Sequence, residues 1–457
     1  MMQNKKVMVL GMARSGIAAA NLLLLRGAKV TVCDMKAEAD FDGALDGIKA
    51  AGAALLLSEA HPEEHLEGLD ALVVSPGIPV DHPAIVKAKA LGVEVLGEVE
   101  LAYRESTGLL LAVTGTNGKT TTVSLLGEIF KNAGRRTFVV GNIGTPYSGA
   151  VPEMKPGDVT VCEISSFQME TSKEFHPAIS AVLNISEDHL NRHGTLEVYV
   201  AMKERVFENC GPEDTLVLNW DDPVTRGMAD RAKCGILWFS SRYPVPEGAF
   251  VVDGTIVFGT PTANKPVCRA DEVYIPGEHN LKNALAATAM AMAAGIPAPV
   301  MRHTLRTFRG VEHRIEFVRE LDGVRYINDS KGTNCDSTIQ AVRAMDRPTV
   351  LILGGYDKHV DFTALCEEIT RCPITHCVLI GKTAQQWEDT LEKVGYHAWT
   401  HAGYDFKAAV ELARSLAQPG GNVLLSPSCA SFDMFSDYEA RGRIFKDIVN
   451  QMESAEA

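Results

Sequence analysis

The segment at residues 114–121, TGTNGKTT, carries the strongest chemical signal in the chain. It follows an apolar strand pattern and precedes a helical one. Glycines let the backbone curl so that several N–H groups point at one phosphate, and the N-terminus of the following helix adds partial positive charge. Lys119 is suited to reach the β- and γ-phosphates of a nucleotide, and the Thr120 hydroxyl to bind Mg²⁺. The segment therefore predicts a nucleoside triphosphate site.

This segment departs from the strict P-loop pattern. Val113 stands where the first glycine is expected, so the loop is shorter. The alternative interpretation is an ordinary turn between a strand and a helix that binds no ligand. The strand before the loop and the helix after it favour the nucleotide site.

A second glycine-containing turn lies near the N-terminus. Residues 11–16 read GMARSG, and Asp34 ends the next predicted strand. The arrangement is similar to a dinucleotide-binding fingerprint, except that Ala13 replaces the middle glycine. Two interpretations stay open: a tight turn without a ligand, and a helix N-terminus that binds a nucleotide diphosphate of another kind.

Acidic and imidazole groups follow two further predicted strands. Glu163 closes the strand at residues 158–164, and His189 comes soon after an apolar strand that ends near Asn184. Ligands of parallel sheets bind at the carboxyl ends of strands, so Glu163 and His189 are expected beside Lys119. A carboxylate and a neutral imidazole suit a Mg²⁺ ion already held by phosphates. Taken alone, His189 is more simply a hydrogen-bonded structural histidine.

Short apolar runs alternate with helical patterns almost throughout the chain, which is typical of parallel sheets with helical crossovers. Strands are expected at residues 5–11, 29–34, 71–75, 109–114, 349–354, 377–381 and 422–426, and helices at 15–26, 98–104, 280–294 and 299–307. The Asp-Gly pairs at 253–254 and 322–323 predict hairpins.

The 457 residues are too many for one ordinary core. The predicted fold class is α/β with three domains. They are a Rossmann-like N-terminal domain at 1–97, a central P-loop ATPase-like α/β domain at 98–311, and a C-terminal Rossmann-like α/β domain at 312–457.

Charge and composition limit the class of partner. The net charge of −14 disfavours nucleic acid or an anionic membrane. No run approaches the roughly 20 apolar residues of a membrane span, and the N-terminus reads as a strand and not as a signal peptide. The ten cysteines are scattered singly, without zinc spacing, which indicates reduced and mostly buried thiols. We therefore expect a cytoplasmic protein.

Seven motifs occur in a characteristic order, at residues 115–120, 141–144, 163–168, 184–189, 277–280, 313–314 and 328–334. Together they resemble the Mur ligases, which build the peptide of bacterial peptidoglycan and are similar to folylpolyglutamate synthetase. The resemblance covers essentially the whole chain. Within the family, the segments LGGYDK at 353–358 and SPSCASFD at 426–433 look like those of the members that add D-glutamate. The Asp-Asn-Pro-Arg signature of the diaminopimelate or lysine adders is missing from the sequence.

The resemblance implies a reaction. An ATP-dependent carboxylate–amine ligase of this kind would add D-glutamate to UDP-N-acetylmuramoyl-L-alanine through an acyl phosphate, giving ADP and phosphate. It would use two Mg²⁺ ions, act as a monomer, and supply cytoplasmic peptidoglycan synthesis. ATP and the sugar nucleotide would sit between domains. The amine must arrive as the free base, so the mechanism also needs a nearby proton acceptor, such as Asp188 or His189.

The resemblance also implies roles for particular residues. The catalytic residues would be Lys119, Glu163, His189 and Lys203. The ATP-binding residues would be Gly115, Thr116, Asn117, Gly118, Lys119, Thr120, Thr121, Asn280, Arg314 and Asp329. The substrate-binding residues would be Arg14, Ser15, Asp34 and Gly77 for the uridine diphosphate, Asn142 and Gln168 for the sugar-peptide end, Lys331 and Thr333 for the reacting groups, and Lys358, Ser431, Phe432 and Tyr438 for D-glutamate. Asn191 stands where some relatives carry aspartate, so the contribution of that aspartate is absent or replaced.

Lys203 has a special role in the resemblance, because it matches a lysine that the family carbamylates. A lysine ammonium repels Mg²⁺, whereas its neutral amine can capture CO₂ and become an anionic oxygen ligand. This requires burial to lower the amine pKa. The metal ligands implied are Thr120, Glu163, His189 and carbamylated Lys203. From the residues alone, a solvated lysine on a helix surface is the simpler interpretation.

Three alternative functions stay open. A P-loop nucleotide switch predicts slow hydrolysis without any amino acid. A nicotinamide oxidoreductase built on the N-terminal domain leaves the phosphate loop unexplained. A sister ligase of different amino-acid specificity, such as the L-alanine adder, shares most of the motifs.

Overall fold

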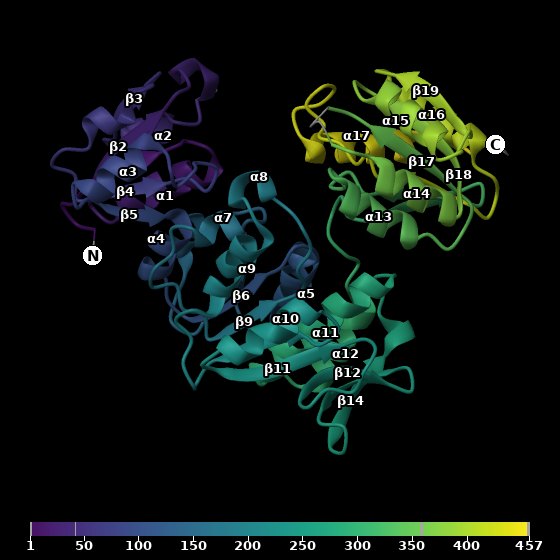
Figure 1. The fold of residues 1–457 in the computed structure, drawn as a ribbon, viewed down its shortest axis with the longest axis horizontal. Helices are drawn as coiled ribbons and strands as arrows, with labels where there is room; N and C mark the ends of the chain where they lie inside the picture. Colours follow the sequence, from purple (N-terminus) through teal and green to yellow (C-terminus); the bar gives the residue numbers. More distant parts are fainter. Residues whose placement is uncertain (1, 42, 357–359, 455–457) are drawn as a thin grey trace. The chain divides into compact units, whose positions relative to one another are not determined.

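The computed structural model describes residues 2–41, 43–356 and 360–454. Its strands form three sheets, of five, nine and six strands (Figure 1). The chain folds as two compact units: Met1–Tyr274 with Asn280–Phe308, and Ile275–His279 with Arg309–Ala457. The three mixed α/β sheets confirm the predicted fold class. The predicted boundaries at 97/98 and 311/312 stay predictions.

The first sheet is wholly parallel, with the order β3-β2-β1-β4-β5 that is typical of Rossmann-like domains. Helix α1 begins tightly against β1, since a Cβ atom at Gly16 would lie 1.9 Å from the Gly11 carbonyl oxygen. The elements are β1 (Lys6–Leu10), α1 (Arg14–Leu25), β2 (Lys29–Asp34), α2 (Asp46–Ala50), β3 (Ala54–Leu57), β4 (Ala71–Val74), α3 (Pro83–Ala90) and β5 (Glu94–Gly97).

The second sheet has the order β14-β13-β12-β11-β10-β9-β6-β8-β7 and is parallel from β7 to β12. The predicted hairpin at 253–254 is confirmed, because β12 and β13 pair antiparallel across it. The strands are β6 (Leu109–Thr114), β7 (Thr137–Gly141), β8 (Val159–Glu163), β9 (Ile179–Val182), β10 (Thr215–Asn219), β11 (Gly235–Ser240), β12 (Gly248–Val252), β13 (Thr255–Gly259) and β14 (Asn264–Arg269). The helices are α4 (Glu98–Glu105), α5 (Lys119–Asn132), α6 (Tyr147–Ala150), α7 (Ser166–Met169), α8 (Leu190–His193), α9 (Leu196–Glu204), α10 (Pro223–Gly227), α11 (Glu278–Ala293) and α12 (Ala298–Thr307).

The third sheet has the order β15-β16-β20-β17-β18-β19, and only the edge strand β15 is antiparallel. The predicted hairpin at 322–323 joins β15 to β16 and is confirmed. The elements are β15 (Glu316–Leu321), β16 (Val324–Asn328), α13 (Cys335–Arg343), β17 (Thr349–Gly354), α14 (Thr363–Arg371), β18 (Ile374–Ile380), α15 (Ala384–Lys393), β19 (Trp399–Gly403), α16 (Phe406–Leu416), β20 (Asn422–Leu425) and α17 (Tyr438–Gln451).

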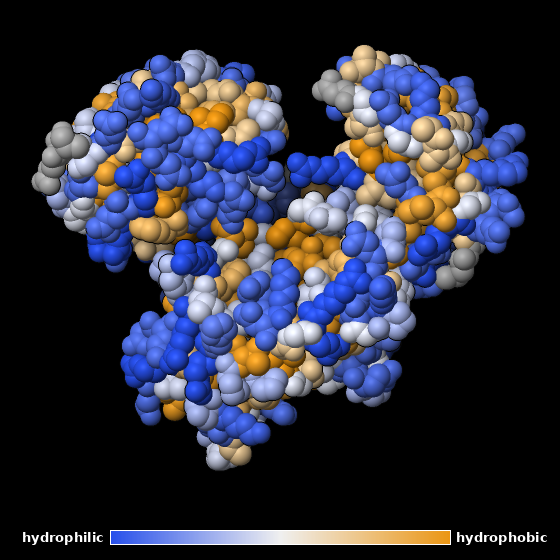
Figure 2. Space-filling model, turned by 180° about the vertical axis from the view of Figure 1, so that it is seen from behind, coloured by the Kyte–Doolittle hydropathy of each residue, from blue (hydrophilic) through white to orange (hydrophobic). Residues whose placement is uncertain are grey.

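The surface and the cysteines agree with the composition. On the face drawn in Figure 2, hydrophilic side chains are spread over the surface of each unit and are interspersed with hydrophobic ones. Among the described residues, no helix combines the length and the apolar character needed to cross a membrane. All ten cysteines are free thiols, and seven of them are buried, which confirms the expectation of reduced and mostly buried thiols.

Candidate active site

The predicted phosphate loop joins the carboxyl end of β6 to the N-terminus of α5. Gly115 and Gly118 both have positive φ, +142° and +84°, which L side chains rarely adopt. A Cβ atom at Gly118 would lie 2.2 Å from Oδ1 of Asn283 on α11. The loop therefore needs glycine for its backbone angles and for the approach of a neighbouring helix.

Asn184, which follows β9, holds the loop in place. The Asn117 N–H donates to Oδ1 of Asn184 at 2.8 Å, and Nδ2 of Asn184 donates back to the Asn117 carbonyl at 3.0 Å. The Thr116 N–H donates to the Asn184 carbonyl at 2.9 Å. These bonds preorganise the backbone, which lowers the entropic cost of binding a phosphate.

Gly118→Ala is expected to weaken nucleotide binding roughly tenfold or more, because the new methyl group must displace Asn283 or the loop itself. Each 1.4 kcal/mol that this displacement costs corresponds to about a tenfold loss of affinity. Gly134→Ala is the matched control: it lies just after α5, has φ +75°, and offers open space, since a Cβ atom added there would meet nothing within 4 Å. Both variants incur the left-handed backbone strain of about 1–2 kcal/mol. Calorimetric binding of ATP separates them, and equal affinities would contradict the crowding argument.

Two lysines converge on one carbonyl of this loop. Nζ of Lys119, the first residue of α5, donates to the carbonyls of Gly115 at 2.8 Å and Thr116 at 2.7 Å. Nζ of Lys203, on α9, donates to the same Gly115 carbonyl at 2.8 Å. The Lys119 ammonium at a helix N-terminus makes this loop attractive to anions.

Lys203 is buried, with 1 % of its surface exposed, so it is not a solvated surface residue. Its Nζ lies 4.5 Å from the centroid of the Tyr199 ring. Burial lowers the pKa of Lys203 well below its ordinary value, and the charge of Lys119 lowers it further. The side chain therefore favours the neutral amine, which is the nucleophilic form.

Glu163, at the end of β8, is 2 % exposed. Its Oε1 accepts a hydrogen bond from Nδ2 of Asn142 at 2.9 Å. Its Oε2 is buried and has no hydrogen-bond partner among the described residues. A buried carboxylate oxygen without a donor is costly unless a cation or another donor completes it. The negative charge of Glu163 also acts on Lys203, which places the two groups in one site.

His189 lies at the N-terminus of α8 with φ +55°, and its side chain is about half exposed, at 47 %. Its Nε2 lies 3.5 Å from Oδ2 of Asp188, and its ring centroid lies 4.7 Å from that of Phe167. The sequence analysis predicted that His189 lies beside Lys119. The described contacts put His189 against Asp188 and Phe167, on the loop that follows β9.

The other predicted residues of the first unit fall into two groups. Asn142 and Gln168 use their side chains within the protein: Asn142 bonds Glu163, and Oε1 of Gln168 accepts from the N–H of Ser165 at 2.8 Å, as part of a capping box. Asn280 lies in the first turn of α11 and accepts at Oδ1 from Nδ2 of Asn283 at 3.3 Å, which places it next to the residue that approaches Gly118.

The predicted uridine diphosphate residues surround the N-terminus of α1. Arg14 is exposed and Ser15 is half-buried in its first turn. Oδ2 of Asp34 accepts from the Met12 N–H at 2.6 Å, so this carboxylate holds the glycine turn. Gly77 is exposed, and its carbonyl accepts from Nη1 of Arg192 at 3.4 Å, linking this loop to α8.

In the second unit, Asp329 follows β16 and is 3 % exposed. Its Oδ2 accepts from the Ser426 hydroxyl at 2.6 Å and its Oδ1 from the Ile315 N–H at 3.1 Å. Burial raises the pKa of Asp329 to about 6, against the opposing charge of Arg314. The carboxylate therefore ties the loop after β16 to the end of β20.

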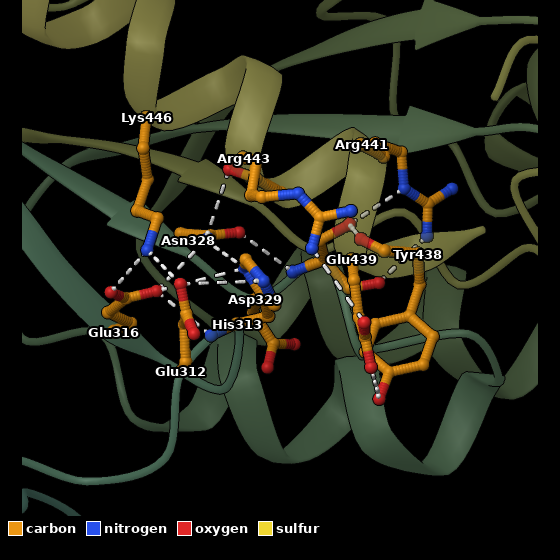
Figure 3. Close-up of polar contacts among 12 residues, drawn as sticks. Glu312, His313, Glu316, Asn328, Asp329, Tyr438, Glu439, Arg441, Arg443 and Lys446 are labelled. Carbon is orange, nitrogen blue, oxygen red and sulfur yellow. Dashed lines mark hydrogen bonds and ion pairs between the residues drawn. The ribbon is translucent and has the colours of Figure 1, made fainter. Parts of the chain in front are cut away.

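Figure 3 shows the polar network that supports these loops. His313 is buried and accepts at Nδ1 from Nδ2 of Asn328 at 2.9 Å, and burial lowers its pKa, so the neutral ring is favoured. Nζ of Lys446 on α17 donates to Glu312 at 2.5 Å and to Glu316 at 3.1 Å. The network fixes the backbone that presents Arg314.

Arg441 on α17 is a supporting residue that the sequence reasoning missed. It is 1 % exposed, and burial lowers its pKa to about 10. Its Nε and Nη2 donate to the Oγ and carbonyl of Ser330, at 2.9 and 2.8 Å, and its Nη1 donates to the Cys429 carbonyl at 3.2 Å. One guanidinium thus joins the two loops that carry the predicted residues Lys331 and Ser431.

Arg441→Lys is expected to loosen both loops and to lower the stability of this unit by about 2 kcal/mol, since an ammonium cannot reproduce the planar fork and leaves a buried carbonyl unpaired. Amide hydrogen exchange at residues 330–333 and 429–431 measures the local effect. Arg443→Lys is the control, because Arg443 lies on the same helix, is 55 % exposed, and lies 3.7 Å from Glu439. Its charge also acts on Glu312 and His313, and lysine keeps that charge. Equal exchange in both variants would contradict the role given to Arg441.

The remaining predicted residues of this unit lie around the same loops. Nζ of Lys331 lies 5.8 Å from the centroid of the Tyr438 ring, and the Thr333 N–H donates to the Lys331 carbonyl at 2.8 Å. Ser431 is buried, whereas Phe432 is 67 % exposed and lies 6.3 Å, centroid to centroid, from Tyr356. Lys358 falls outside the described residues.

The chain matches three family models, in order. They are the Mur ligase MurD-like N-terminal domain at residues 5–97, the Mur ligase middle domain at 113–291, and the Mur ligase glutamate ligase domain at 313–429. One match falls on each of the three sheets, with the first four residues of β6 outside the middle match.

Similar proteins span the full length of the chain. A UDP-N-acetylmuramoylalanine–D-glutamate ligase of Caldanaerobacter subterraneus subsp. tengcongensis is 47% identical over 449 residues, covering 98% of each chain. One of Clostridioides difficile is 43% identical over 452 residues, covering 99% of each.

Solved structures share the fold at low identity. The UDP-N-acetylmuramate–alanine ligase MurC of Thermotoga maritima has a TM-score of 0.62 at 17% identity, covering 98% of this chain and 100% of that one. The MurF ligase of Thermotoga maritima in complex with ADP has a TM-score of 0.58 at 17% identity, covering 98% and 96%. With relatives this similar along its whole length, the chain belongs to the Mur ligase family of ATP-dependent amide ligases.

Proposed function

We propose that this chain adds D-glutamate to UDP-N-acetylmuramoyl-L-alanine, with cleavage of ATP to ADP and phosphate, in cytoplasmic peptidoglycan precursor synthesis. The observation that carries the proposal is the full-length similarity to relatives that are named for this reaction. The cluster of Lys119, Lys203 and Glu163 around the phosphate loop supplies the chemistry that such a reaction needs.

The reaction proceeds in two steps. A carboxylate is a poor electrophile, because attack on it must expel an oxide-like leaving group. The substrate carboxylate therefore attacks the γ-phosphorus of ATP, ADP leaves, and an acyl phosphate forms. The amine of D-glutamate, as the free base, then attacks the acyl carbon, phosphate leaves with the bonding electrons, and the amine proton passes to a base. We assign that base to Asp188 or His189.

Lys119 acts on the charge of the first step. Its ammonium already lies over the phosphate loop, held by two backbone carbonyls. Negative charge spreads over the γ-phosphoryl oxygens and the leaving ADP during transfer, and a fixed cation stabilises it without reorganisation. The N-terminus of α5, which begins at Lys119, adds a partial positive charge at the same place.

The residues present fit Mg²⁺. Oε2 of Glu163 is buried without a donor among the described residues, and Thr120 presents a hydroxyl in the first turn of α5. We propose that Thr120 and Glu163 hold one ion, and that His189 and a carbamate of Lys203 hold the second. When bound, such ions offset the charge of the phosphates and of the attacking carboxylate.

The environment of Lys203 supports carbamylation. Its buried side chain favours the neutral amine, whose nitrogen can add to CO₂ with loss of one proton to form an anionic carbamate. The negative charge of Glu163 and Asp188 near Lys203 opposes a second anion there, so a cation between them is needed for the carbamate to persist.

The remaining assignments are part of the same proposal. The substrate-binding residues are Arg14, Ser15, Asp34, Gly77, Asn142, Gln168, Lys331, Thr333, Lys358, Ser431, Phe432 and Tyr438. Arg314 and Asp329 are proposed ATP-binding residues of the second unit, and the chain is proposed to act as a monomer without membrane or nucleic-acid partners.

One experiment separates this function from its alternatives. The purified chain is incubated with ATP, Mg²⁺ and UDP-N-acetylmuramoyl-L-alanine, and phosphate release is measured with D-glutamate, L-alanine, L-lysine or diaminopimelate in turn. Release with D-glutamate alone, together with a product heavier by one glutamyl residue, is expected. Release with another amino acid would make the chain a sister ligase. Slow hydrolysis that ignores both the acceptor and the amino acid would make it a nucleotide switch.

A further inference from the structure

A cluster of metal-binding side chains lies far from the phosphate loop along the same sheet. Parallel pairing sets Ile179, Thr215 and Gly235, the first residues of β9, β10 and β11, side by side. The residues just before these strands are therefore neighbours at the amino edge of the sheet. The candidate active site follows the opposite, carboxyl ends of β6, β8 and β9.

Three unlike donors meet at this amino edge. One ligand atom each from His176, Cys210 and Asp214 lie within 4.8 Å of one another. Nε2 of His176 lies 2.6 Å from Oδ2 of Asp214, and the Cys210 thiol donates to the Pro177 carbonyl at 3.4 Å. An imidazole, a thiol and a carboxylate are the ligand types that zinc takes in proteins.

Cys234 adds a fourth donor. It directly precedes β11, and the Gly235 N–H donates to the Asp214 carbonyl at 3.0 Å, which holds the two segments together. Its thiol interacts with that of Cys210, and this interaction lowers the pKa of Cys234, whereas the same interaction and burial raise the pKa of Cys210. The sequence has no zinc spacing, because these four residues come from three separate segments that only the sheet register aligns.

We propose that His176, Cys210, Asp214 and Cys234 form a structural site for a thiophilic divalent cation, of which Zn²⁺ is the best fit. Ligand atoms around tetrahedral zinc lie roughly 3.3–3.8 Å apart, given bonds of about 2.0–2.3 Å. To bind an ion, the ligand atoms of His176, Cys210 and Asp214, which lie within 4.8 Å of one another, must move closer together, and the Cys234 side chain must turn toward them. The ion would take the place of the thiol protons, which pass to solvent, and of the proton between Nε2 of His176 and Asp214, which moves to Nδ1 of a neutral imidazole or passes to solvent from a charged one.

The surroundings favour a bound ion over an accidental cluster. Cys210 and Asp214 are 3 % and 6 % exposed, which protects the ion from water. The His176 side chain is 34 % exposed and leaves a path for entry. The Gly211 N–H donates to Oδ2 of Asp214 at 2.7 Å and orients the carboxylate, as outer hydrogen bonds do in zinc sites. The ion would fasten the starts of three adjacent strands.

The test uses the full-length chain, reduced and freed of metal, titrated with Co²⁺. Cobalt bound by thiolates has a charge-transfer band in the near ultraviolet, and the predicted Mg²⁺ ligands include no sulfur. We expect one equivalent of Co²⁺ to produce this band, Zn²⁺ to abolish it by displacement, and Zn²⁺ to raise the Tm of the chain.

Three variants locate the site. Cys210→Ser and Cys234→Ser should each weaken the band and lower the Co²⁺ affinity at least roughly 100-fold, because even the hydrogen-bonding partners of metal ligands contribute about 10–100-fold. Asp214→Asn keeps both thiols and should lower the affinity while keeping the band at saturation. Cys372→Ser is the matched control, since Cys372 is a half-buried thiol that contacts Glu368 in the other unit.

Several outcomes overturn the proposal. A wild-type chain that develops no sulfur band with Co²⁺ would mean that the thiols bind no ion. A band that persists in Cys210→Ser, with the far-ultraviolet circular dichroism unchanged, would place the ion elsewhere. If Cys210 and Cys234 form a disulfide on oxidation, and the reduced chain binds no metal, the two thiols are a redox pair and not a metal site.

Discussion

Lys119→Ala is expected to lower the rate of phosphate release at least about 10³-fold while leaving the chain folded. Removal of one preorganised donor to a transition state costs roughly 10²–10³-fold, and Lys119 carries a full charge at the phosphate loop. The fold should survive, because Nζ of Lys119 only donates to two carbonyls of the loop. One of these, the Gly115 carbonyl, keeps its hydrogen bond from Lys203.

Lys131→Ala is the matched control for this variant. Lys131 lies in the last turn of the same helix, α5, and its side chain is 55 % exposed. Its ammonium lies 3.9 Å from Oε2 of Glu128, so its loss changes stability by about 1 kcal/mol or less. Steady-state phosphate release with D-glutamate and the acceptor measures both. Near-normal activity of Lys119→Ala would remove the phosphate-loop assignment.

Sequence patterns located several strands of each sheet, but not all of them. The predicted strands at 29–34, 109–114 and 349–354 coincide with β2, β6 and β17 to the residue. Each is an apolar run bounded by glycine, a charge or a loop, so the local pattern alone marks its ends. The strand predicted at 377–381 begins three residues earlier, at Ile374, because polar Thr375 and His376 continue the strand beside β17 and interrupt the apolar run.

The candidate site was predictable only where the residues are contiguous. The loop at 114–121 could be found because its glycines, lysine and threonine are adjacent in the chain. Asn283 and Arg441 were missed, because their importance comes from contacts that only the fold makes. Asn283 lies beside Gly118, and Arg441 bonds the loops that carry Ser330 and Cys429. No spacing in the sequence announces such contacts.

Lys203 was the residue on which sequence and structure differed most. By pattern it is one polar position on a short helix, and a solvated lysine was the simpler interpretation. In the structure it is 1 % exposed and donates to the phosphate loop. Tyr199 lies four residues earlier on the same helix, so its contact with Lys203 follows from the helical pattern. Burial also depends on what packs over the helix, here the loop after β6, and that contact is not visible from the pattern.

Lys203→Ala is expected to lower activity about as strongly as loss of a metal ligand, and short carboxylic acids such as formate or acetate should restore part of it. The acid can enter the space left by the side chain and stand in for the carbamate. The same acids should not rescue Lys119→Ala, because a carboxylate cannot replace a cation. Lys265→Ala, at an exposed lysine of β14, is the control and should keep full activity. Full activity of Lys203→Ala without any additive would make Lys203 dispensable.

Stability against pH tests the burial of Lys203 without any substrate. The ordinary pKa of lysine, 10.5, applies to the unfolded chain, and in the folded chain burial holds the pKa of Lys203 well below it. Between these two values the unfolded state binds a proton that the native state lacks, so stability rises with pH through this range. Lys203→Met removes that dependence. In CO₂-free buffer, its Tm relative to the parent should therefore be highest at neutral pH and should fall as the pH approaches that ordinary lysine value. A constant difference in Tm across this range would mean that the native amine carries its proton like an exposed one, and would remove the neutral nucleophile that carbamylation requires.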